Sequence, residues 1–476
     1  MQPSVWNRLA EEIGRLESAV RELPVLPDLS AADLRAELTA RYRFDAPRPL
    51  AAVTEDVIRL LRRGIVHVTH PRYFGLFNPS VLEGAIVGDV LAAAFNPQLA
   101  AWSHAPAAIE IERHTLRCFS AVLGLDPDAT TATFTAGGAE ANLQAVLAAI
   151  AHRFPETGAA GLMGLERRPA IYVTGESHHS FVKIARMTGL GTASLRQIPT
   201  TPGNVLDVAA LERRIERDRR EERIEPLVIV GTAGTTSAGL VDPLAEIAAV
   251  AARAGAWFHV DAAWGGAAAL SPKLWGVLDG IQRADSITWD AHKWLSVPMG
   301  AGMFFCRHPQ AVARAFAAST SYMPPPAGSD TVDPYVTTAQ WTRRAIGLKV
   351  FMVLAQLGLD GYRALIERQA EMGDLLREKL RQAGWTAVGD TPLPVVCFTH
   401  PDLEGEKVTT AEILQEVYRR RNVWISDVEL RGRRVLRACI TSFRTDPSDV
   451  SCLIDELEHA RHAAREAGTT ATTGAS

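Results

Sequence analysis

Two residues of the sequence could together hold a pyridine ring. Asp261 follows a short apolar run at 257–260, and Lys293 follows a second one at 286–289. A lysine amine that is buried beside apolar rings loses proton affinity and can condense with an aldehyde as a Schiff base. A buried carboxylate that faces a pyridine nitrogen keeps this nitrogen protonated, which makes the ring an electron sink. The pair therefore predicts pyridoxal-phosphate chemistry.

Each residue has a simpler explanation when it is taken alone. A lysine beside tryptophan is commonly a surface side chain, and an aspartate after a strand commonly caps a helix. The runs at 257–260 and 286–289 favour the joint interpretation, because both have the pattern of buried strands. Ligands of open α/β sheets gather at the carboxyl ends of the strands, so Asp261 and Lys293 are predicted to face one crevice.

Over most of its length the sequence resembles the group II pyridoxal-phosphate-dependent amino-acid decarboxylases, which include the aromatic-amino-acid and glutamate decarboxylases. The motifs that carry the resemblance are HPRYF at 70–74, TAGGAEAN at 135–142, ESHHS at 176–180, GTAGTT at 231–236, HVDAAWGG at 259–266, WDAHKW at 289–294 and LRACI at 436–440. The separation of 32 residues between Asp261 and Lys293 also resembles that family. The resemblance implies a fold-type I α/β enzyme that binds pyridoxal 5'-phosphate and assembles as a homodimer.

The resemblance assigns several residues to the cofactor's phosphate. Gly138 and Ala139 match the phosphate-cradling positions, and His292 is expected as a further phosphate contact. A glycine pair before a helix is commonly a plain turn, but small residues there also let backbone N–H groups approach a phosphate. No GxGxxG motif follows a first strand, which argues against an enzyme that uses NAD.

The resemblance also places residues around the cofactor ring. His179, aligned on the residues at 180–183, matches the histidine that stacks on one face of the ring, and Ala263 would cover the other face. Thr236 matches the threonine near the phenolic oxygen, with Thr235 as the alternative.

Decarboxylation must return a proton to Cα, and in the resembled family a tyrosine on a loop after the lysine strand supplies it. The matching segment, 319–344, contains Tyr322 and Tyr335. Tyr335 is preferred, because Asp333-Pro334-Tyr335 precedes Trp341 much as in the aromatic decarboxylases. The expected catalytic residues are therefore Lys293, His179 and Tyr335.

The segment at 73–77 resembles the stretch that lines the substrate pocket of the aromatic enzymes. Tyr73, Phe74 and Phe77 are the expected pocket residues, together with His104, which departs from the family pattern. The resemblance implies decarboxylation of an L-amino acid, with an aromatic or bulky apolar side chain favoured, through a Schiff base on Lys293. Alternatives are an acidic or diamino-acid substrate, an aldehyde synthase, an aminotransferase, a carbon–carbon lyase, or a catalytically silent scaffold protein.

Alternating helical and strand patterns predict an α/β protein with a mainly parallel sheet. The expected units are an N-terminal helical segment that clasps a partner subunit (1–80), a large cofactor-binding domain (81–345), a small α+β domain (346–465) and a disordered tail (466–476). The strands of the large domain are expected at 171–174, 227–231, 257–260, 286–289 and 302–306. Spacing of apolar residues predicts an amphipathic helix at 6–20.

Composition restricts the partners that the chain is expected to have. The 476 residues carry a net charge of −4, which gives no reason to expect nucleic acid or an anionic membrane. The five cysteines are scattered and form no CxxC pair, so neither a disulfide framework nor a metal site is predicted. No apolar run approaches the roughly 18 residues that span a bilayer. A cytoplasmic enzyme that acts on an amino acid as its small-molecule substrate is expected.

Overall fold

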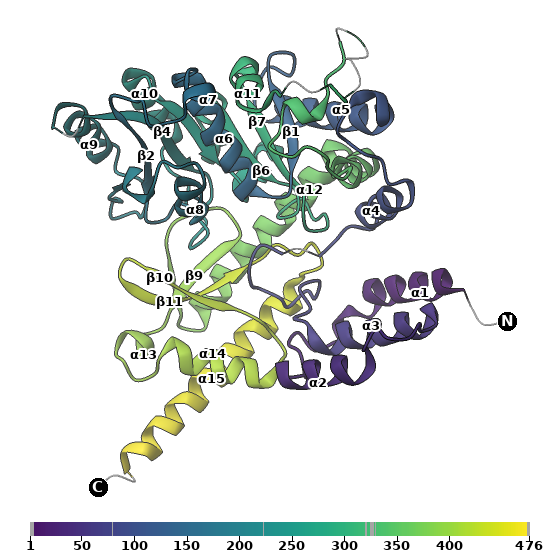
Figure 1. Ribbon diagram of the computed structural model, residues 1–476. Helices are drawn as coiled ribbons and strands as arrows, with labels where there is room; N and C mark the ends of the chain where they lie inside the picture. The colour runs from purple at the N-terminus through teal and green to yellow at the C-terminus, as the bar shows by residue number, and fades with distance from the viewer. Residues whose placement is uncertain are drawn as a thin grey trace.

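A seven-stranded sheet forms the centre of the large unit (Figure 1). The computed structural model describes residues 4–78, 80–221, 223–318, 321–323, 328 and 330–473. The strands run in the order β1-β7-β6-β5-β4-β2-β3, with β3, β2, β4, β5 and β6 parallel and β7 antiparallel to both β6 and β1. They are β1 (Thr131–Thr135), β2 (Arg168–Thr174), β3 (Leu195–Ile198), β4 (Ile224–Thr232), β5 (Trp257–Asp261), β6 (Ser286–Asp290) and β7 (Gly302–Cys306).

Helices cover both faces of this sheet, which makes the strands apolar on both sides. Along β2, Ile171 and Val173 pack in one core cluster, whereas Ala170 and Tyr172 pack in another. The helices of the large unit are α4 (Glu83–Phe95), α5 (Pro106–Val122), α6 (Gly138–Arg153), α7 (Thr157–Ala160), α8 (Ser180–Met187), α9 (Val208–Glu221), α10 (Leu244–Ala254) and α11 (Pro309–Phe316). All five predicted strands are present, so the expected α/β fold with a mainly parallel sheet is confirmed.

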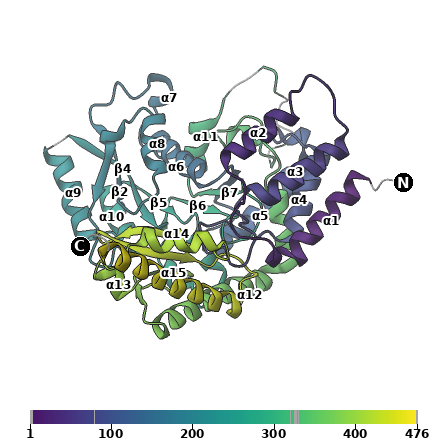
Figure 2. The ribbon, with the colours of Figure 1, turned by 90° about the horizontal axis from the view of Figure 1, so that it is seen from below.

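The C-terminal unit contains a four-stranded antiparallel sheet of order β10-β11-β9-β8. Its elements are α12 (Gly347–Gln382), β8 (Thr386–Val388), β9 (Val395–Thr399), α13 (Pro401–Glu404), α14 (Thr410–Arg420), β10 (Ser426–Leu430), β11 (Arg433–Cys439) and α15 (Pro447–Thr473). In α15, Val450, Leu453, Leu457 and Ala460 recur at helical spacing and enter the core of this unit. Seen from below in Figure 2, α14 and α15 lie in front of the large unit.

Helix α15 corrects the expected disordered tail. The helix continues through most of 466–476 and ends at Thr473, while 474–476 lie outside the described residues. The packed turns before this segment nucleate the helix, so that each further residue adds one hydrogen bond without a new nucleation cost.

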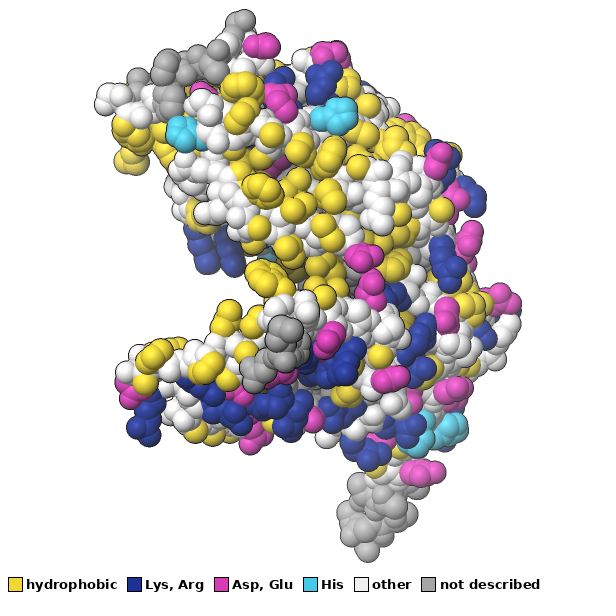
Figure 3. Space-filling model, turned by 90° about the vertical axis from the view of Figure 1, so that its right-hand side faces the viewer, with side chains coloured by type: hydrophobic (Ala, Val, Ile, Leu, Met, Phe, Trp, Pro, Cys, Tyr) yellow, Lys and Arg dark blue, Asp and Glu magenta, His cyan; other side chains and the backbone are white. Residues whose placement is uncertain are grey.

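The N-terminal segment forms three helices, α1 (Val5–Ser18), α2 (Ala31–Arg41) and α3 (Leu50–Gly64). Helix α1 matches the predicted amphipathic helix, and it lies beside α3 (Figures 1 and 2). Helix α2 was not predicted, although Ser30 and Asp33 form a capping box at its start. Figure 3 shows a hollow between this segment and the large unit, with hydrophobic side chains on its walls.

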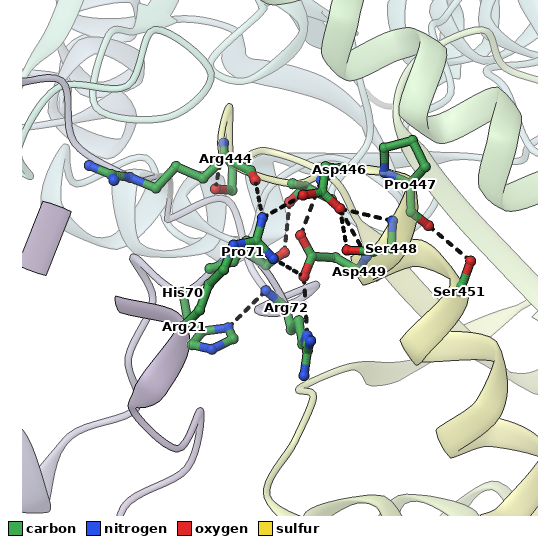
Figure 4. A network of polar contacts seen from close by, with 12 residues as sticks. Arg21, His70, Pro71, Arg72, Arg444, Asp446, Pro447, Ser448, Asp449 and Ser451 are labelled. Carbon is green, nitrogen blue, oxygen red and sulfur yellow. Dashed lines mark hydrogen bonds and ion pairs between the residues drawn. The ribbon is translucent and has the colours of Figure 1, made fainter. Parts of the chain in front are cut away.

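An ionic network joins the N-terminal segment to the C-terminal unit (Figure 4). The carboxylate of Asp449, fully buried at the start of α15, accepts a hydrogen bond from Arg21 Nη1 at 2.6 Å and one from Arg72 Nε at 3.1 Å. His70 accepts the backbone N–H of Arg72 at Nδ1, at 2.9 Å. The motif at 70–74 is therefore anchored to the C-terminal unit. None of the described helices is both long and apolar enough to cross a membrane.

Candidate active site

A cavity of about 230 Å³ opens at the carboxyl ends of β4, β5 and β6. Strand β5 ends at Asp261, and Lys293 follows the end of β6 by three residues. The cavity is lined by Gly137, Gly138, Ala139, Asn142, Glu176, His178, Thr232, Gly234, Thr236, Asp261, Ala263, Trp264, Asp290, His292 and Lys293. The structure thus brings Asp261 and Lys293 to one crevice, where the strand pattern places them.

The amine of Lys293 has a carboxylate partner and an aromatic support. Its Nζ lies 3.1 Å from Oδ2 of the buried Asp290 and 6.0 Å from the centre of the Phe77 ring. The neighbouring Trp294 stacks on Trp264, with ring centres 5.0 Å apart and planes at 9°. This stack fixes the backbone next to the lysine, so the amine is held at the cavity wall.

Asp261 is buried at the floor of the cavity, and each of its oxygens accepts a hydrogen bond. Asn142 Nδ2 donates to Oδ2 at 2.8 Å, and the backbone N–H of Ala263 donates to Oδ1 at 3.1 Å. A carboxylate has about four acceptor sites, so Asp261 can also accept a hydrogen bond from a protonated ring nitrogen. The carboxylate therefore fits a pyridine cofactor.

The N-terminus of the 16-residue helix α6 forms another wall of the cavity. A Cβ atom at Gly138 would come within 2.9 Å of Asp290 Oδ2 and 3.2 Å of Ala263 Cβ, so only glycine permits this close approach. His292 accepts the backbone N–H of Ala301 at Nδ1, and burial lowers the pKa of its imidazole. A helix N-terminus of this kind binds phosphate, which fits the expected roles of Gly138, Ala139 and His292.

His178 lines the cavity, whereas the sequence analysis assigned the place over the ring to His179. Burial lowers the pKa of His178, and the nearby carboxylate of Asp261 opposes this shift. The backbone N–H of Ser180 donates to His178 Nδ1 at 3.2 Å, so the neutral ring carries its proton on Nε2. His179 is the N-cap residue of α8 and is exposed outside the cavity. Adjacent residues of a turn point in different directions, so His178, and not the expected His179, faces the cavity.

Thr236 lines the cavity, and the geometry explains why Thr235 does not. The hydroxyl of Thr235 is fully buried and accepts the backbone N–H of Leu240 at 3.1 Å. Thr235 therefore closes the turn after β4. Ala263 also lines the cavity, on the side expected for the second face of a ring.

Neither candidate tyrosine lines the cavity of its own chain. Tyr335 lies in a 3-10 turn, η7 (Pro334–Val336), with its ring 5.0 Å from that of Trp341. Tyr322 is exposed, and its ring lies 6.0 Å from that of Trp341. Part of this loop, 319–320, 324–327 and 329, lies outside the described residues. The proton donor stays a prediction.

Of the four expected pocket residues, only Phe77 approaches Lys293. The hydroxyl of Tyr73 accepts the backbone N–H of Leu76 at 3.1 Å, and its ring packs against another aromatic residue outside the cavity. Phe74 is fully buried in the core of the C-terminal unit, because the motif at 70–74 is anchored there. His104 is exposed in η2 (Trp102–His104). Within one chain, the structure therefore corrects the expectation for Tyr73, Phe74 and His104.

Arg437 is a buried cation near this site, and the sequence analysis gave it no role. The side chain is 1% exposed, and its guanidinium carbon lies 5.0 Å from the centre of the Phe77 ring. Its Nη1 donates to the backbone carbonyl of Gly75 at 3.3 Å, while Nε and Nη2 have no hydrogen-bond partner among the described residues. An arginine among the buried apolar residues at 435–439 of β11 was the signal that could have identified it.

Comparison with known proteins agrees with this geometry. Residues 33–400 match the pyridoxal-dependent decarboxylase conserved domain. The chain is similar to a tyrosine decarboxylase of Oryza sativa subsp. japonica (31% identity over 82% of this chain and 75% of that protein) and to an L-2,4-diaminobutyrate decarboxylase of Rhizobium meliloti strain 1021 (29% identity, 86% and 81%). It also resembles the crystal structure of Oryza sativa TDC with PLP and tryptamine, with a TM-score of 0.89, 26% identity and 96% of each chain covered. A match over this much of the sequence, with the lysine and the acid at one cavity, makes the chain a member of the pyridoxal-dependent decarboxylase family.

Proposed function

We propose that this enzyme decarboxylates an L-amino acid with an aromatic or bulky apolar side chain and releases the amine and carbon dioxide. The observation that carries the proposal is the convergence of Lys293 and Asp261 on the cavity at the strand ends. Pyridoxal phosphate, when bound, supplies an aldehyde for amines and a ring that accepts electrons. Carbon dioxide release measured for each of the twenty amino acids tests the reaction and its substrate; no release from any of them would refute it.

The residues of the cavity have separate roles in this proposal. Lys293 anchors the cofactor covalently, and Asp290 at 3.1 Å orients its amine. Asp261 holds a proton on the pyridine nitrogen, which the electron sink needs. His178 covers one face of the cofactor ring. Ala263 covers the other face, and its small side chain does not tilt the ring.

Arg437 is proposed to bind a carboxylate of the substrate. Two of its nitrogens lack hydrogen-bond partners among the described residues although the side chain is buried, and an unpartnered buried cation is costly. The α-carboxylate of any amino acid would accept hydrogen bonds from the free nitrogens of Arg437. Phe77, beside Arg437, offers an apolar contact for the side chain of the substrate. An acidic substrate is the second candidate, because the same cation could instead bind a side-chain carboxylate. The amino-acid screen separates the two.

A homodimer is proposed from the exposed apolar face of α3. Leu50, Val57 and Leu61 of this amphipathic helix are exposed, whereas Ile58 of the same helix is buried. Exposing several large apolar side chains on one helix face is unfavourable in water, so this face is expected to be covered by a second subunit.

Tyr335 and His104 are proposed to serve the cavity of the partner subunit. The two segments that carry them are tied together, because the backbone N–H of Tyr335 donates to the carbonyl of Ala100 and that of Trp102 donates to Asp333 Oδ1 at 2.7 Å. Neither residue lines the cavity of its own chain. In a homodimer the same segment of the other subunit can close the cavity, with Tyr335 returning the proton to Cα and His104 facing the substrate.

A further inference from the structure

A chain of four hydrogen bonds runs from Asp261 through the interior of the large unit. Asp261 Oδ2 accepts Asn142 Nδ2 at 2.8 Å, and Asn142 Oδ1 lies 3.0 Å from His259 Nε2. His259 Nδ1 lies 2.9 Å from Ser286 Oγ, which in turn accepts Trp257 Nε1 at 2.8 Å. All five side chains are buried. We call this chain the Asp261 relay.

The two ends of the Asp261 relay fix the direction of every bond in it. The indole N–H of Trp257 can only donate, and an ionised carboxylate at Asp261 can only accept. Asn142 must therefore turn its NH₂ group toward the carboxylate and its oxygen toward His259. The imidazole then carries its proton on Nε2, and its Nδ1 accepts the hydroxyl proton of Ser286. Every donor points toward Asp261.

Two further contacts agree with this direction. The second N–H of the Asn142 amide faces Ser180 Oγ at 3.3 Å, so its NH₂ group has two acceptors on that side. Complete burial lowers the pKa of His259 to about 4, which keeps the imidazole neutral near pH 7. A neutral imidazole has one donor and one acceptor, as the Asp261 relay requires.

A proton on Asp261 Oδ2, the oxygen that accepts from Asn142, would leave the relay incomplete. A carboxylic acid would donate to Asn142, the amide would turn over, and His259 would donate from Nδ1 to Ser286. The hydroxyl oxygen would then receive two donors, and its own proton would have no acceptor among the described neighbours. An unsatisfied buried hydroxyl is unfavourable. The relay therefore disfavours a proton on Oδ2, and the backbone N–H of Ala263 already donates to Oδ1.

We propose that Trp257, Ser286 and His259 are positioning residues that act through Asn142 to hold Asp261 as an ionised carboxylate facing the pyridine nitrogen. This inference rests on the proposed role of Asp261 in cofactor binding. None of the three lines the cavity, so they affect the cofactor only through the carboxylate.

The first test needs no cofactor. In apoprotein labelled with nitrogen-15 at its 13 histidines, the signal that disappears in His259→Asn identifies His259. We expect the Nε2–H tautomer, with no titration between pH 6 and 8. A protonated imidazolium or the Nδ1–H tautomer in that range would overturn the direction of the relay.

The second test is a double-mutant cycle on the affinity of the apoprotein for pyridoxal phosphate, measured by equilibrium dialysis. Ser286→Ala should weaken binding on the order of tenfold, as outer partners of a buried ligand do. In an Asp261→Asn background the same change should have an effect below about twofold, because the relay then has no carboxylate to hold. At saturating cofactor, Ser286→Ala should lower kcat and leave KM unchanged.

Ser120→Ala is the matched control, because Ser120 is also 1% exposed and its hydroxyl donates only to its own helix, at Leu116 O. It should leave the affinity unchanged. If Ser286→Ala does not fold, Trp257→Phe removes the terminal donor alone and should weaken binding in the same direction by a smaller factor. Equal losses in both backgrounds would overturn the relay and leave the role of Asp261 standing. An Asp261→Asn enzyme with normal affinity and turnover would instead overturn the proposed function.

Discussion

The amine of Lys293 and the carboxylate of Asp290 lie 3.1 Å apart at the end of β6. Lys293→Ala removes the covalent anchor, so carbon dioxide release should be abolished. Asp261→Ala should still bind pyridoxal phosphate but lose turnover, because the pyridine nitrogen deprotonates. Lys273→Ala, at an exposed lysine paired with Glu367, is the control and should keep full activity. Wild-type release by Lys293→Ala would contradict the whole functional assignment.

The adjacent histidines provide an internal comparison. His178→Ala should weaken cofactor binding about two- to tenfold, since ring stacking contributes roughly 0.5–1.5 kcal/mol. His179→Ala should bind normally, because its side chain lies outside the cavity. Absorbance titration of each apoprotein with pyridoxal phosphate measures both. Weaker binding in His179→Ala than in His178→Ala would assign the place over the ring to His179.

Tyr335→Phe should change the product of the reaction. Without the hydroxyl that returns a proton to Cα, the carbanion left by loss of carbon dioxide would persist and be oxidised by molecular oxygen, so the product should shift from amine toward aldehyde, with release of ammonia and hydrogen peroxide. Loss of one positioned proton donor typically slows its step by about a hundredfold or more. Product analysis under air decides the matter, with Tyr322→Phe as the paired variant. Loss of amine only in Tyr322→Phe would move the role to that residue, and aldehyde from the unmodified enzyme would refute decarboxylation to the amine.

The dimer proposal predicts that a charge on α3 separates the subunits. Leu61 is 50% exposed, and Leu61→Glu should shift sedimentation from dimer to monomer, as should removal of residues 1–45. Met163→Glu places the same charge on a side chain that is 99% exposed elsewhere and should leave the dimer intact. A dimeric, active Leu61→Glu enzyme would count against this interface.

Mixed dimers test whether Tyr335 acts in the cavity of its own subunit or in that of the partner subunit. A dimer of one Lys293→Ala subunit and one Tyr335→Phe subunit keeps one complete site only if lysine and tyrosine come from different chains. Amine formation should therefore rise above that of either variant alone when the two proteins are refolded together. A mixture that stays inactive would place both residues in one chain.

His70 makes stability depend on pH. Burial lowers its pKa from 6.5 to about 4, so the neutral ring stabilises the fold above about pH 6.5, and this contribution is lost as the pH falls toward 4. Asn at this position can still accept the backbone N–H of Arg72 but does not titrate. Between pH 7.5 and 5, wild type should lose roughly 2 kcal/mol more unfolding free energy than His70→Asn. Urea unfolding at the two pH values measures the difference; equal losses would contradict it.

Features that depend on local pattern could be predicted from the sequence. The apolar runs before Asp261 and Lys293 predicted two strands and their convergence, because strand ends meet at one edge of a parallel sheet. Which of His178 and His179 faces the cavity depends on the turn between β2 and α8, and the periodicity of neither element extends into it. Arg437 was missed because burial of a cation is a property of the packed fold.

The Asp261 relay could not have been predicted either. Its members come from α6, β5 and β6, and the pairing of His259 with Ser286 depends on the register of β5 and β6. Taken singly, His259 and Asn142 are only polar residues inside apolar segments. The three-dimensional structure alone shows that they form one continuous chain.

Helix α12 has a consequence for how the protein unfolds. Its backbone departs from helical geometry at Gly358, with φ 64° and ψ 179°, so two helical stretches meet there, and side chains of the stretch after Gly358 enter two cores. Val350 and Ile366 pack in the core of the large unit, whereas Leu376 and Leu380 pack in that of the C-terminal unit. Melting of either core would strip apolar partners from the other through this shared helix. The two units are therefore expected to melt in one cooperative transition in calorimetry, although they are separate in the ribbon diagram.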